Sequence, residues 1–150
     1  MNLEVSVMQT DHVPLKVLAD YCVAAKKPGF TSEPKQEFIK NHGCLGGRYS
    51  RSRFMSQSRP ETLQFQVEAS SFHPLGLLFI SCYVKAIPAS SPNTIEDKAC
   101  SFTEGRWRAV RGNDQFCSCC GSTCGMRKAR DVDSDVKWDA ELVVGPLIIQ

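Results

Sequence analysis

The sequence predicts an all-β fold, a sandwich or barrel of short antiparallel strands held together by disulfide bonds. Two observations predict the strands: apolar residues alternate with polar ones at a period of two, and turn residues recur between the alternating segments. A third observation predicts the disulfides, because the 150 residues include eight cysteines, an even number that is high for a cytosolic enzyme. A chain of this length suits one domain with a sizeable core.

The strands are expected where the alternation occurs. It is clearest from Leu63 to Ala69 and also covers residues 3–7 and 15–20. Such alternation places one face of a strand on the core and leaves the other in water. The segment from Leu77 to Ile87 is apolar on both faces and is therefore predicted to be a central strand that carries Cys82. Turn residues separate the segments at Lys27-Pro28-Gly29, Gly46-Gly47, Ser58-Arg59-Pro60, Pro74-Leu75-Gly76 and Ser91-Pro92-Asn93.

Helix is expected to be scarce. Short helical turns are predicted over Ser32–Lys40 and Thr94–Ala99, and a short hairpin is predicted around Trp107 and Val110. Four cysteines fall within the segment Cys117–Cys124, which is too dense for regular strands.

Differences in amino-acid composition divide the chain into three parts. Residues 1–125 are expected to form the folded domain with a C-terminal cysteine-rich subregion. Residues 126–141 are charged and have little to bury, so they are predicted to be an exposed, cleavable linker. Residues 142–150 form an apolar, β-branched run that is predicted to be the last strand.

Charge and hydropathy restrict the classes of partner. A formal net charge of +2 predicts no strong attraction to nucleic acid or to an anionic membrane. No stretch approaches the ~18–20 apolar residues of a membrane span. The one local excess of basic residues, at Arg48, Arg51, Arg53 and Arg59, is interpreted as a solvated loop.

The cysteines favour an oxidised, extracellular protein. The first residues lack the basic and apolar regions of a signal peptide, so the chain is expected to be a fragment of a longer secreted precursor. The pattern Cys117-x-Cys119-Cys120-x-x-x-Cys124 invites comparison with zinc sites, but adjacent cysteines suit tetrahedral ligation poorly and no histidine lies nearby. Disulfides are therefore predicted, with no metal and no cofactor.

No combination of residues predicts catalysis. The histidines are His12, His42 and His73, and no serine-hydrolase elbow, zinc-protease helix or P-loop motif occurs. Asp20 and Asp97 lie close to cysteines but have no evident acid–base partner. No catalytic residue is assigned, and the protein is expected not to be an enzyme.

One segment of the predicted linker has the spacing of a furin-type cleavage site. Arg127-Lys128-Ala129-Arg130 offers guanidinium groups at both ends, which the acidic pockets of such proteases recognise. The segments Arg48–Arg51 and Arg108–Arg111 have the same spacing. Position favours Arg130, because it follows the last cysteine in an exposed segment that a protease can bind.

The apolar tail is predicted to be a core strand with a second role. A strand joined through a cleavable linker can occupy a sheet edge and be removed later. An exposed sheet edge is a template for another chain, so covering it would delay assembly until the linker is cut.

Short segments spread over most of the chain carry a family resemblance. They are Val13-Pro14-Leu15-Lys16-Val17, Asp20-Tyr21-Cys22-Val23-Ala24, Asn41-His42-Gly43-Cys44-Leu45, Leu63-Gln64-Phe65, Ile80-Ser81-Cys82-Tyr83-Val84-Lys85, Lys98-Ala99-Cys100-Ser101-Phe102, Cys117-Ser118-Cys119-Cys120 and Val144-Gly145-Pro146-Leu147-Ile148. Together they resemble the C-terminal half, the ZP-C subdomain, of zona pellucida domain proteins, in particular the egg-coat members. The dispersed cysteine order with one adjacent pair makes the resemblance specific.

The resemblance implies an immunoglobulin-like antiparallel sandwich that lacks its first strand before Leu3. It also implies that Cys22 bridges Cys82 and thereby joins the edge of one sheet to a central strand. Cys44 pairs either with Cys100 or with a member of the C-terminal cluster. The arrangement that we favour is Cys44 with Cys120, Cys100 with Cys117, and Cys119 with Cys124.

The resemblance also assigns roles to the C-terminal segment. Arg127, Lys128, Ala129 and Arg130 match the furin-type site, although family sites are often richer in basic residues than one with Ala129. Beyond it, the family has an external hydrophobic patch that blocks premature polymerisation. The matching residues are Val143, Val144, Gly145, Pro146, Leu147, Ile148 and Ile149.

The function that the resemblance implies is structural. The protein is expected to be secreted into the extracellular egg coat, with any membrane anchor of its precursor outside this chain. Its implied partners are other zona pellucida domain proteins in filaments, a furin-like protease and sperm receptors. Two alternatives stay open: a module of the same family in another matrix or receptor ectodomain, and a cytosolic zinc-binding domain.

Overall fold

The structure, a computed structural model, describes residues 1–8, 14–47, 51–57, 59–68, 72, 76–124 and 138–148. Its strands form a three-stranded sheet in the order β1-β6-β5 and a seven-stranded sheet in the order β10-β7-β2-β3-β4-β8-β9. In chain order the elements are β1 (Asn2–Ser6), β2 (Leu15–Ala25), β3 (Lys35–Lys40), β4 (Cys44–Leu45), β5 (Arg53–Phe54), β6 (Thr62–Gln66), β7 (Leu77–Pro88), β8 (Cys100–Thr103), β9 (Arg106–Ala109), the 3-10 helix η2 (Asp114–Gly121) and β10 (Trp138–Ile148).

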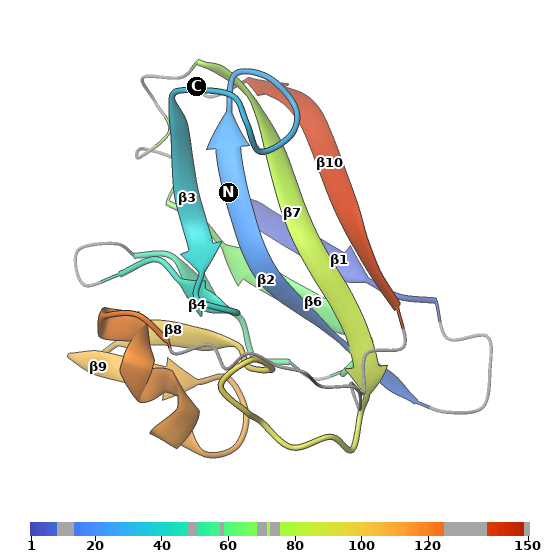
Figure 1. Cartoon of the computed structure of the whole chain (residues 1–150), viewed down its shortest axis with the longest axis vertical. Coiled ribbons are helices and arrows are strands. Elements are labelled where there is room, and N and C mark those ends of the chain that lie inside the picture. The colour runs from blue at the N-terminus through green and yellow to red at the C-terminus, as the bar shows by residue number, and fades with distance from the viewer. Residues whose placement is uncertain are drawn as a thin grey trace.

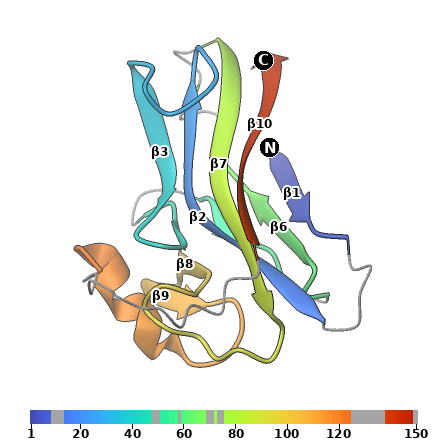
Figure 2. The same cartoon turned by 45° about the vertical axis from the view of Figure 1, so that its right-hand side comes forward.

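The two sheets pack face to face around one apolar core. Figure 1 shows β1 and β6 behind the layer formed by β2, β3 and β7, and the turned view of Figure 2 shows them to the right of β7. Leu63 and Phe65 of β6 belong to the same buried cluster as Val17, Ile39 and Val84 of the large sheet. The burial of these side chains is the main favourable term in folding. The all-β, disulfide-stapled class predicted from the sequence is confirmed.

The segment predicted to be a central strand forms β7. It lies between β10 and β2 and is antiparallel to both. Cys82 and Val84 are buried, and so are Ser81 and Lys85 on the opposite face of the strand, whereas Tyr83 on that face is 41% exposed. Side chains on both faces of the strand are therefore buried apart from Tyr83, which agrees with the absence of alternation in its sequence.

One strand pair departs from the antiparallel arrangement. β4 and β8 are parallel, with Cys44 opposite Cys100 and Leu45 opposite Ser101. β8 comes from much later in the chain and enters the sheet with its hairpin partner β9. A parallel pair needs such a long connection, so local sequence patterns do not reveal it.

The cysteine-rich subregion consists of the β8–β9 hairpin and η2. The hairpin predicted around Trp107 is confirmed, and Phe102 and Trp107 pack edge to face with ring centroids 5.5 Å apart. At the start of η2 the Asn113 side chain accepts a hydrogen bond from the Gln115 amide, as N-cap residues do. Figure 1 shows the subregion packed against the lower end of the large sheet.

Both helical turns predicted from the sequence are wrong. Residues 35–40 form β3, which pairs with β2 and buries Phe38 and Ile39. Over residues 94–99 there is a turn in which the Thr94 hydroxyl accepts the amide hydrogens of Glu96 and Asp97. In the first case pairing with a distant strand overrides local helical propensity, and in the second the Thr94 side chain holds a local turn in place of a helix.

The last strand is longer than the sequence predicts. It begins at Trp138, whereas the charge pattern predicts that residues 138–141 belong to the linker. Within the described part of the chain, no helix is long and apolar enough to cross a membrane.

Candidate functional site

The last strand, β10, forms one edge of the large sheet, and among the described strands β7 is its only neighbour in that sheet. The pairing runs from Trp138 opposite Ala86 to Ile148 opposite Leu77. Figure 1 shows β10 in red along the right side of β7. The predicted external patch therefore lies at a sheet edge as far as Ile148, and Ile149 falls outside the described residues.

Most apolar side chains of β10 face solvent. Leu142, Val143 and Val144 are between 43% and 50% exposed, and Ile148 is 71% exposed. Among the β10 side chains that the structure describes, Ala140 and Leu147 are the two that pack, partly buried, against the core. The attachment of β10 thus depends on its main-chain pairing with β7 and on few side chains, since exposed apolar groups gain little burial energy.

Gly145 lets β10 approach β7 closely at an irregularity in the pairing. The register shifts between Val144 and Leu147. Gly145 has a φ of 142°, and a Cβ atom there would lie 2.9 Å from the Leu78 carbonyl oxygen and 2.8 Å from the Phe79 ring. Glycine is required here because any other residue would collide with β7.

Four disulfides tie the domain together, and none of the eight cysteines is free. They are Cys22–Cys82, Cys44–Cys120, Cys100–Cys117 and Cys119–Cys124. These are the same pairs as in the arrangement favoured from the family resemblance. Cys44–Cys120 and Cys100–Cys117 both link η2 to strands β4 and β8, so they hold the cysteine-rich subregion on the sheet.

The Cys22–Cys82 bridge has a different position from the expected one. Cys22 and Cys82 are directly opposite each other on the neighbouring strands β2 and β7, with Cα atoms 4.1 Å apart. Both strands lie inside the large sheet, so the bridge does not join an edge to a central strand. The sequence separation of 60 makes it a long-loop crosslink within one sheet.

Three sulfurs lie near one another beneath η2. The Sγ atoms of Cys44, Cys120 and Cys124 are within 4.8 Å of one another, and all three residues are buried. This is the part of the chain where the zinc alternative placed its ligands. In the structure each sulfur is half of a disulfide and therefore has no thiolate to offer a metal.

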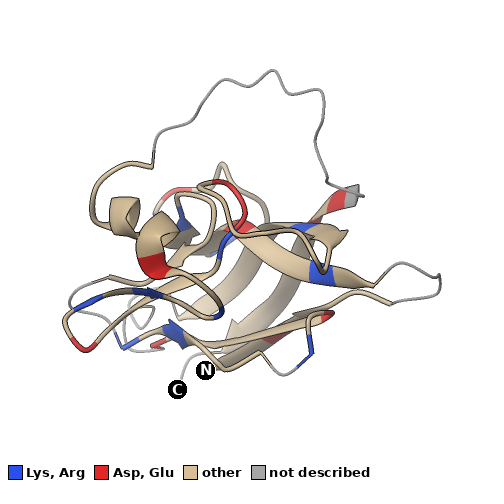
Figure 3. Ribbon diagram, turned by 90° about the horizontal axis from the view of Figure 1, so that it is seen from below, with Lys and Arg blue, Asp and Glu red and all other residues tan. Residues whose placement is uncertain are grey.

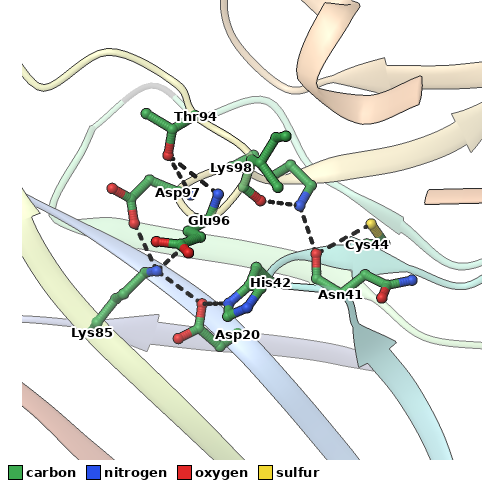
Figure 4. A network of polar contacts seen from close by, with 10 residues as sticks. Asp20, Asn41, His42, Cys44, Lys85, Thr94, Glu96, Asp97 and Lys98 are labelled. Atoms are coloured by element: carbon green, nitrogen blue, oxygen red, sulfur yellow. Dashed lines mark hydrogen bonds and ion pairs between the residues drawn. The ribbon is translucent and has the colours of Figure 1, made fainter. Parts of the chain in front are cut away.

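A network of charged groups joins the sheet to the loop that leads into the cysteine-rich subregion (Figure 4). The Nζ atom of Lys85 on β7 lies 2.9 Å from Asp20 Oδ1 on β2 and 2.7 Å from Asp97 Oδ1 in the loop. The Lys85 side chain is only 7% exposed. Burial lowers the pKa of Lys85, but the two carboxylates more than offset it and raise the pKa above its ordinary value.

Asp20 has a second partner in the same network. Its Oδ1 atom lies 3.3 Å from His42 Nδ1. Burial alone would raise the pKa of Asp20, but the hydrogen bond with His42 and the charge of Lys85 together lower it. The carboxylate therefore stays ionised within a largely buried cluster.

Lys98 completes the network on the loop side. Its residue is 1% exposed, and its ammonium group donates hydrogen bonds to the carbonyl oxygens of Asn41, at 2.6 Å, and Ile95. Burial, followed by the nearby charge of Lys85, lowers the pKa of Lys98 to about 8. The loop is thus pinned to the β3–β4 turn by a buried lysine.

Two members of this network could be noticed in the sequence, but their common partner could not. Asp20 and Asp97 stood out beside cysteines without an evident partner, and Lys85 is the partner that they share. A single lysine in a strand or loop gives little signal, because such lysines are usually exposed. The one available sign was that Lys85 lies within the apolar run of residues 77–87, near its end.

The other positions singled out in the sequence are basic residues and histidines. Some are exposed in the structure, and others lie outside the described residues. Arg51, Arg53 and Arg59 are exposed, in agreement with the solvated interpretation. Figure 3 shows blue and red segments interspersed around the β8–β9 hairpin and not a face of one sign. Arg127–Arg130, Arg48, His12 and His73 lie outside the described residues.

Comparison with known proteins places this fold in a family. A model of the ZP-C domain of the zona pellucida family matches residues 1–101. Zona pellucida sperm-binding protein 3 of Felis catus is 35% identical over 98% of this chain and 40% of its own length. The proteins of the same name from Rattus norvegicus and Gallus gallus are 32% and 30% identical, over 98% and 99% of this chain and 41% and 39% of their lengths.

The family model covers β1 to β7 and the first two residues of β8, whereas β9, η2 and β10 lie beyond the matched residues. The chain spans about two fifths of the length of the curated relatives that it matches. The chain therefore belongs to the zona pellucida family and carries its ZP-C domain.

Proposed function

We propose that this chain is a structural module of an extracellular egg coat and that β10 is a strand released by proteolysis. The family and its zona pellucida relatives support the structural role. The observation that carries the proposal is the position of β10, an edge strand with exposed apolar residues that covers β7. A matrix role and not a catalytic one is proposed.

Cleavage after Arg130 would divide the chain between its disulfide-held part and β10. Cys124 is the last cysteine, so residues beyond position 130 have no covalent crosslink to the domain. After the cut, β10 would be held to β7 by non-covalent contacts alone. Its few buried side chains would then favour release.

Release of β10 would expose the main-chain groups of β7. An open edge of this kind pairs readily with a strand from another chain. In the uncleaved chain β10 would block such pairing and delay assembly. The proposed partners are accordingly a furin-like protease and other zona pellucida domain proteins in a filament.

The cleavage step is tested by expression of the chain in secretory cells and by mass spectrometry of its C-terminus. We expect a mature C-terminus at Arg130 and four disulfides in wild type, and an intact tail in Arg130→Ala. Arg51→Ala alters an exposed arginine of another motif with the same spacing and serves as the matched control, which should be cleaved normally. An intact tail in wild type, or cleavage that persists in Arg130→Ala, would contradict the proposal.

The blocking role of β10 needs a separate test. Deletion of residues 143–149 should produce early aggregation or misfolding, because β7 loses its cover before secretion. Size-exclusion chromatography of the secreted protein provides the measurement. A truncated chain that remains soluble and monomeric would exclude the blocking role.

We also propose a role in sperm binding. It derives from the name of the relatives, zona pellucida sperm-binding protein 3. Competition by the purified chain for sperm attachment to eggs of the source organism is the direct measurement. Attachment that is unaffected by a large excess of the chain would remove this role from this part of the protein.

A further inference from the structure

An open pocket of about 570 Å³ lies on the outer face of the large sheet. Its walls come from four segments: β2, the β3–β4 turn, β7 and the residues that follow η2. The described residues that line it include Asp20, Tyr21, Asn41, His42, Tyr83 and Thr123. No part of the function proposed above uses this pocket.

Two tyrosines give the pocket an aromatic wall. Tyr21 and Tyr83 are opposite each other on β2 and β7, and their ring centroids are 6.2 Å apart with an interplanar angle of 28°. Phe30 stacks on Tyr83 with centroids 4.1 Å apart, and the Tyr21 hydroxyl donates to Glu37 at 2.6 Å. The rings are therefore held in place before any ligand arrives, while Tyr83 remains 41% exposed.

Polar groups with unused bonding capacity stand beside these rings. Asp20 uses Oδ1 for both His42 and Lys85, and among the described residues its Oδ2 atom has no hydrogen-bond or ion-pair partner. Within the described part of the chain, His42 Nε2 and the Thr123 hydroxyl also have no hydrogen-bond partner. The pocket thus combines a carboxylate acceptor, an imidazole nitrogen and a hydroxyl group next to aromatic faces.

The charges around the pocket favour a neutral ligand. The Asp20 carboxylate is already paired with Lys85, which is also paired with Asp97 (Figure 4). A cationic ligand would have to compete with Lys85 for Asp20. An anionic ligand would meet the carboxylate, and no lysine or arginine is among the described residues that line the pocket to offset the repulsion.

We propose that this pocket binds a neutral pyranose, as the terminal sugar of a glycan. The weakly positive C–H groups on one face of a pyranose ring pack on the electron-rich faces of aromatic rings. Its hydroxyl groups donate to a carboxylate and exchange hydrogen bonds with imidazole and hydroxyl groups. The open mouth of the pocket leaves room for the rest of the glycan.

Methyl glycosides of neutral pyranoses test the proposal, because the methyl group stands for the rest of the glycan. The oxidised chain is titrated with methyl β-galactopyranoside, methyl β-glucopyranoside and methyl α-mannopyranoside, and binding is followed by saturation-transfer NMR. We expect saturable binding of at least one sugar with a Kd on the order of 1 mM, as befits so small a ligand. No saturable binding of any of them would overturn the proposal.

Variants locate the binding site. Tyr83→Ala should weaken binding about three- to tenfold through loss of the ring face, and Thr123→Val should weaken it through loss of one hydroxyl. Gln64→Ala is the matched control, because Gln64 lines a second, polar depression that has no aromatic wall. Each variant must first show the wild-type circular dichroism spectrum and melting temperature. Thr123→Val alters one exposed hydroxyl, so it keeps the test open if Tyr83→Ala misfolds.

Charged ligands test whether the pocket prefers a neutral ligand. Argininamide and methyl glucuronide are titrated under the same conditions as the neutral sugars. Tighter binding of either one than of every neutral sugar would contradict the proposal. Equal affinity of wild type and both pocket variants for the sugar would do so as well.

Discussion

Gly43 and Lys98 lie in such close contact that a Cβ atom at position 43 would be 2.0 Å from the Lys98 carbonyl oxygen. Gly43 also has a φ of 116°, and its own carbonyl accepts the Cys100 amide hydrogen at 2.8 Å. The turn between β3 and β4 and the loop before β8 therefore meet backbone to backbone. This contact brings the parallel strands β4 and β8 together.

Replacement of Gly43 should disrupt this contact. Gly43→Ala should lower the free energy of unfolding by about 3 kcal/mol, because overpacking and an unfavourable φ act together. Gly47→Ala is the matched control, since nothing lies within 4 Å of a Cβ atom there, and its effect should stay within about 0.5 kcal/mol. Urea denaturation of both variants provides the measurement. Equal stability of the two variants would show that the loop before β8 moves to accommodate the methyl group at little cost in free energy.

Replacement of Gly145 should loosen β10 and leave the rest of the domain folded. Gly145→Ala places a methyl group against Leu78 and Phe79, so hydrogen exchange should become faster at β7 amides that face β10. Amide hydrogen exchange along β2 should keep its wild-type rate.

Gly76→Ala is the control for Gly145→Ala. Gly76 also has a positive φ, at 69°, but a Cβ atom there would meet nothing within 4 Å. It therefore shows the effect of backbone strain without the collision. The same exchange pattern in both variants would mean that the collision with β7 is unimportant.

The disulfides should differ in their contribution to stability. The chain-entropy model gives about 4 kcal/mol for Cys22–Cys82 and about 2 kcal/mol for Cys119–Cys124, because the sequence separations are 60 and 5. The double replacements by serine should therefore reduce stability and secretion in that order. Secreted yield and thermal melting provide the measurements. Normal secretion without Cys22–Cys82 would count against its structural role.

The buried lysine of the loop should make stability depend on alkaline pH. The pKa of Lys98 is about 8 in the folded protein against 10.5 for an ordinary lysine, so the unfolded chain binds more protons between these values. Stability contributed by this group therefore increases as pH rises from 8. Tyr21, whose pKa is raised from 10.0 to about 12 by burial and by Glu37, acts in the opposite direction above pH 10.

The window from pH 8 to pH 10 tests the effect of Lys98. Burial also lowers the pKa of Lys16, which adds a dependence of the same sign, so urea midpoints at pH 8, 9 and 10 should rise in wild type and rise less steeply in Lys98→Met. The exposed Lys26→Met serves as the control and should keep the wild-type slope. A slope in Lys98→Met equal to that of wild type would assign the dependence to another group.

Local sequence patterns were sufficient for the strands that bury one or both faces. The alternation around Leu63 and Phe65 predicts β6, and the apolar run of residues 77–87 predicts β7. These patterns are informative because the side chains of a strand alternate between its two faces. The cysteine content likewise indicated the disulfides, and the family resemblance supplied their partners.

Other features depend on residues that are far apart in the chain. Lys35–Lys40 becomes a strand because β2 offers it a partner, and the loop before β8 is held to the β3–β4 turn because Lys98 donates to Asn41. Neither partner can be recognised from the local sequence. The same holds for the start of β10 at Trp138, which pairing with Ala86 determines.

By itself, the sequence determined an all-β domain with an even set of cysteines and a terminal apolar strand, because these depend on composition and on a period of two. Only the tertiary structure decided that β10 lies at the edge beside β7 and that β4 and β8 are parallel. It also decided that Lys85 lies between Asp20 and Asp97, and that Tyr21 and Tyr83 form one wall. The physical reason is that burial and pairing are satisfied between distant segments, whose encounter no local pattern records.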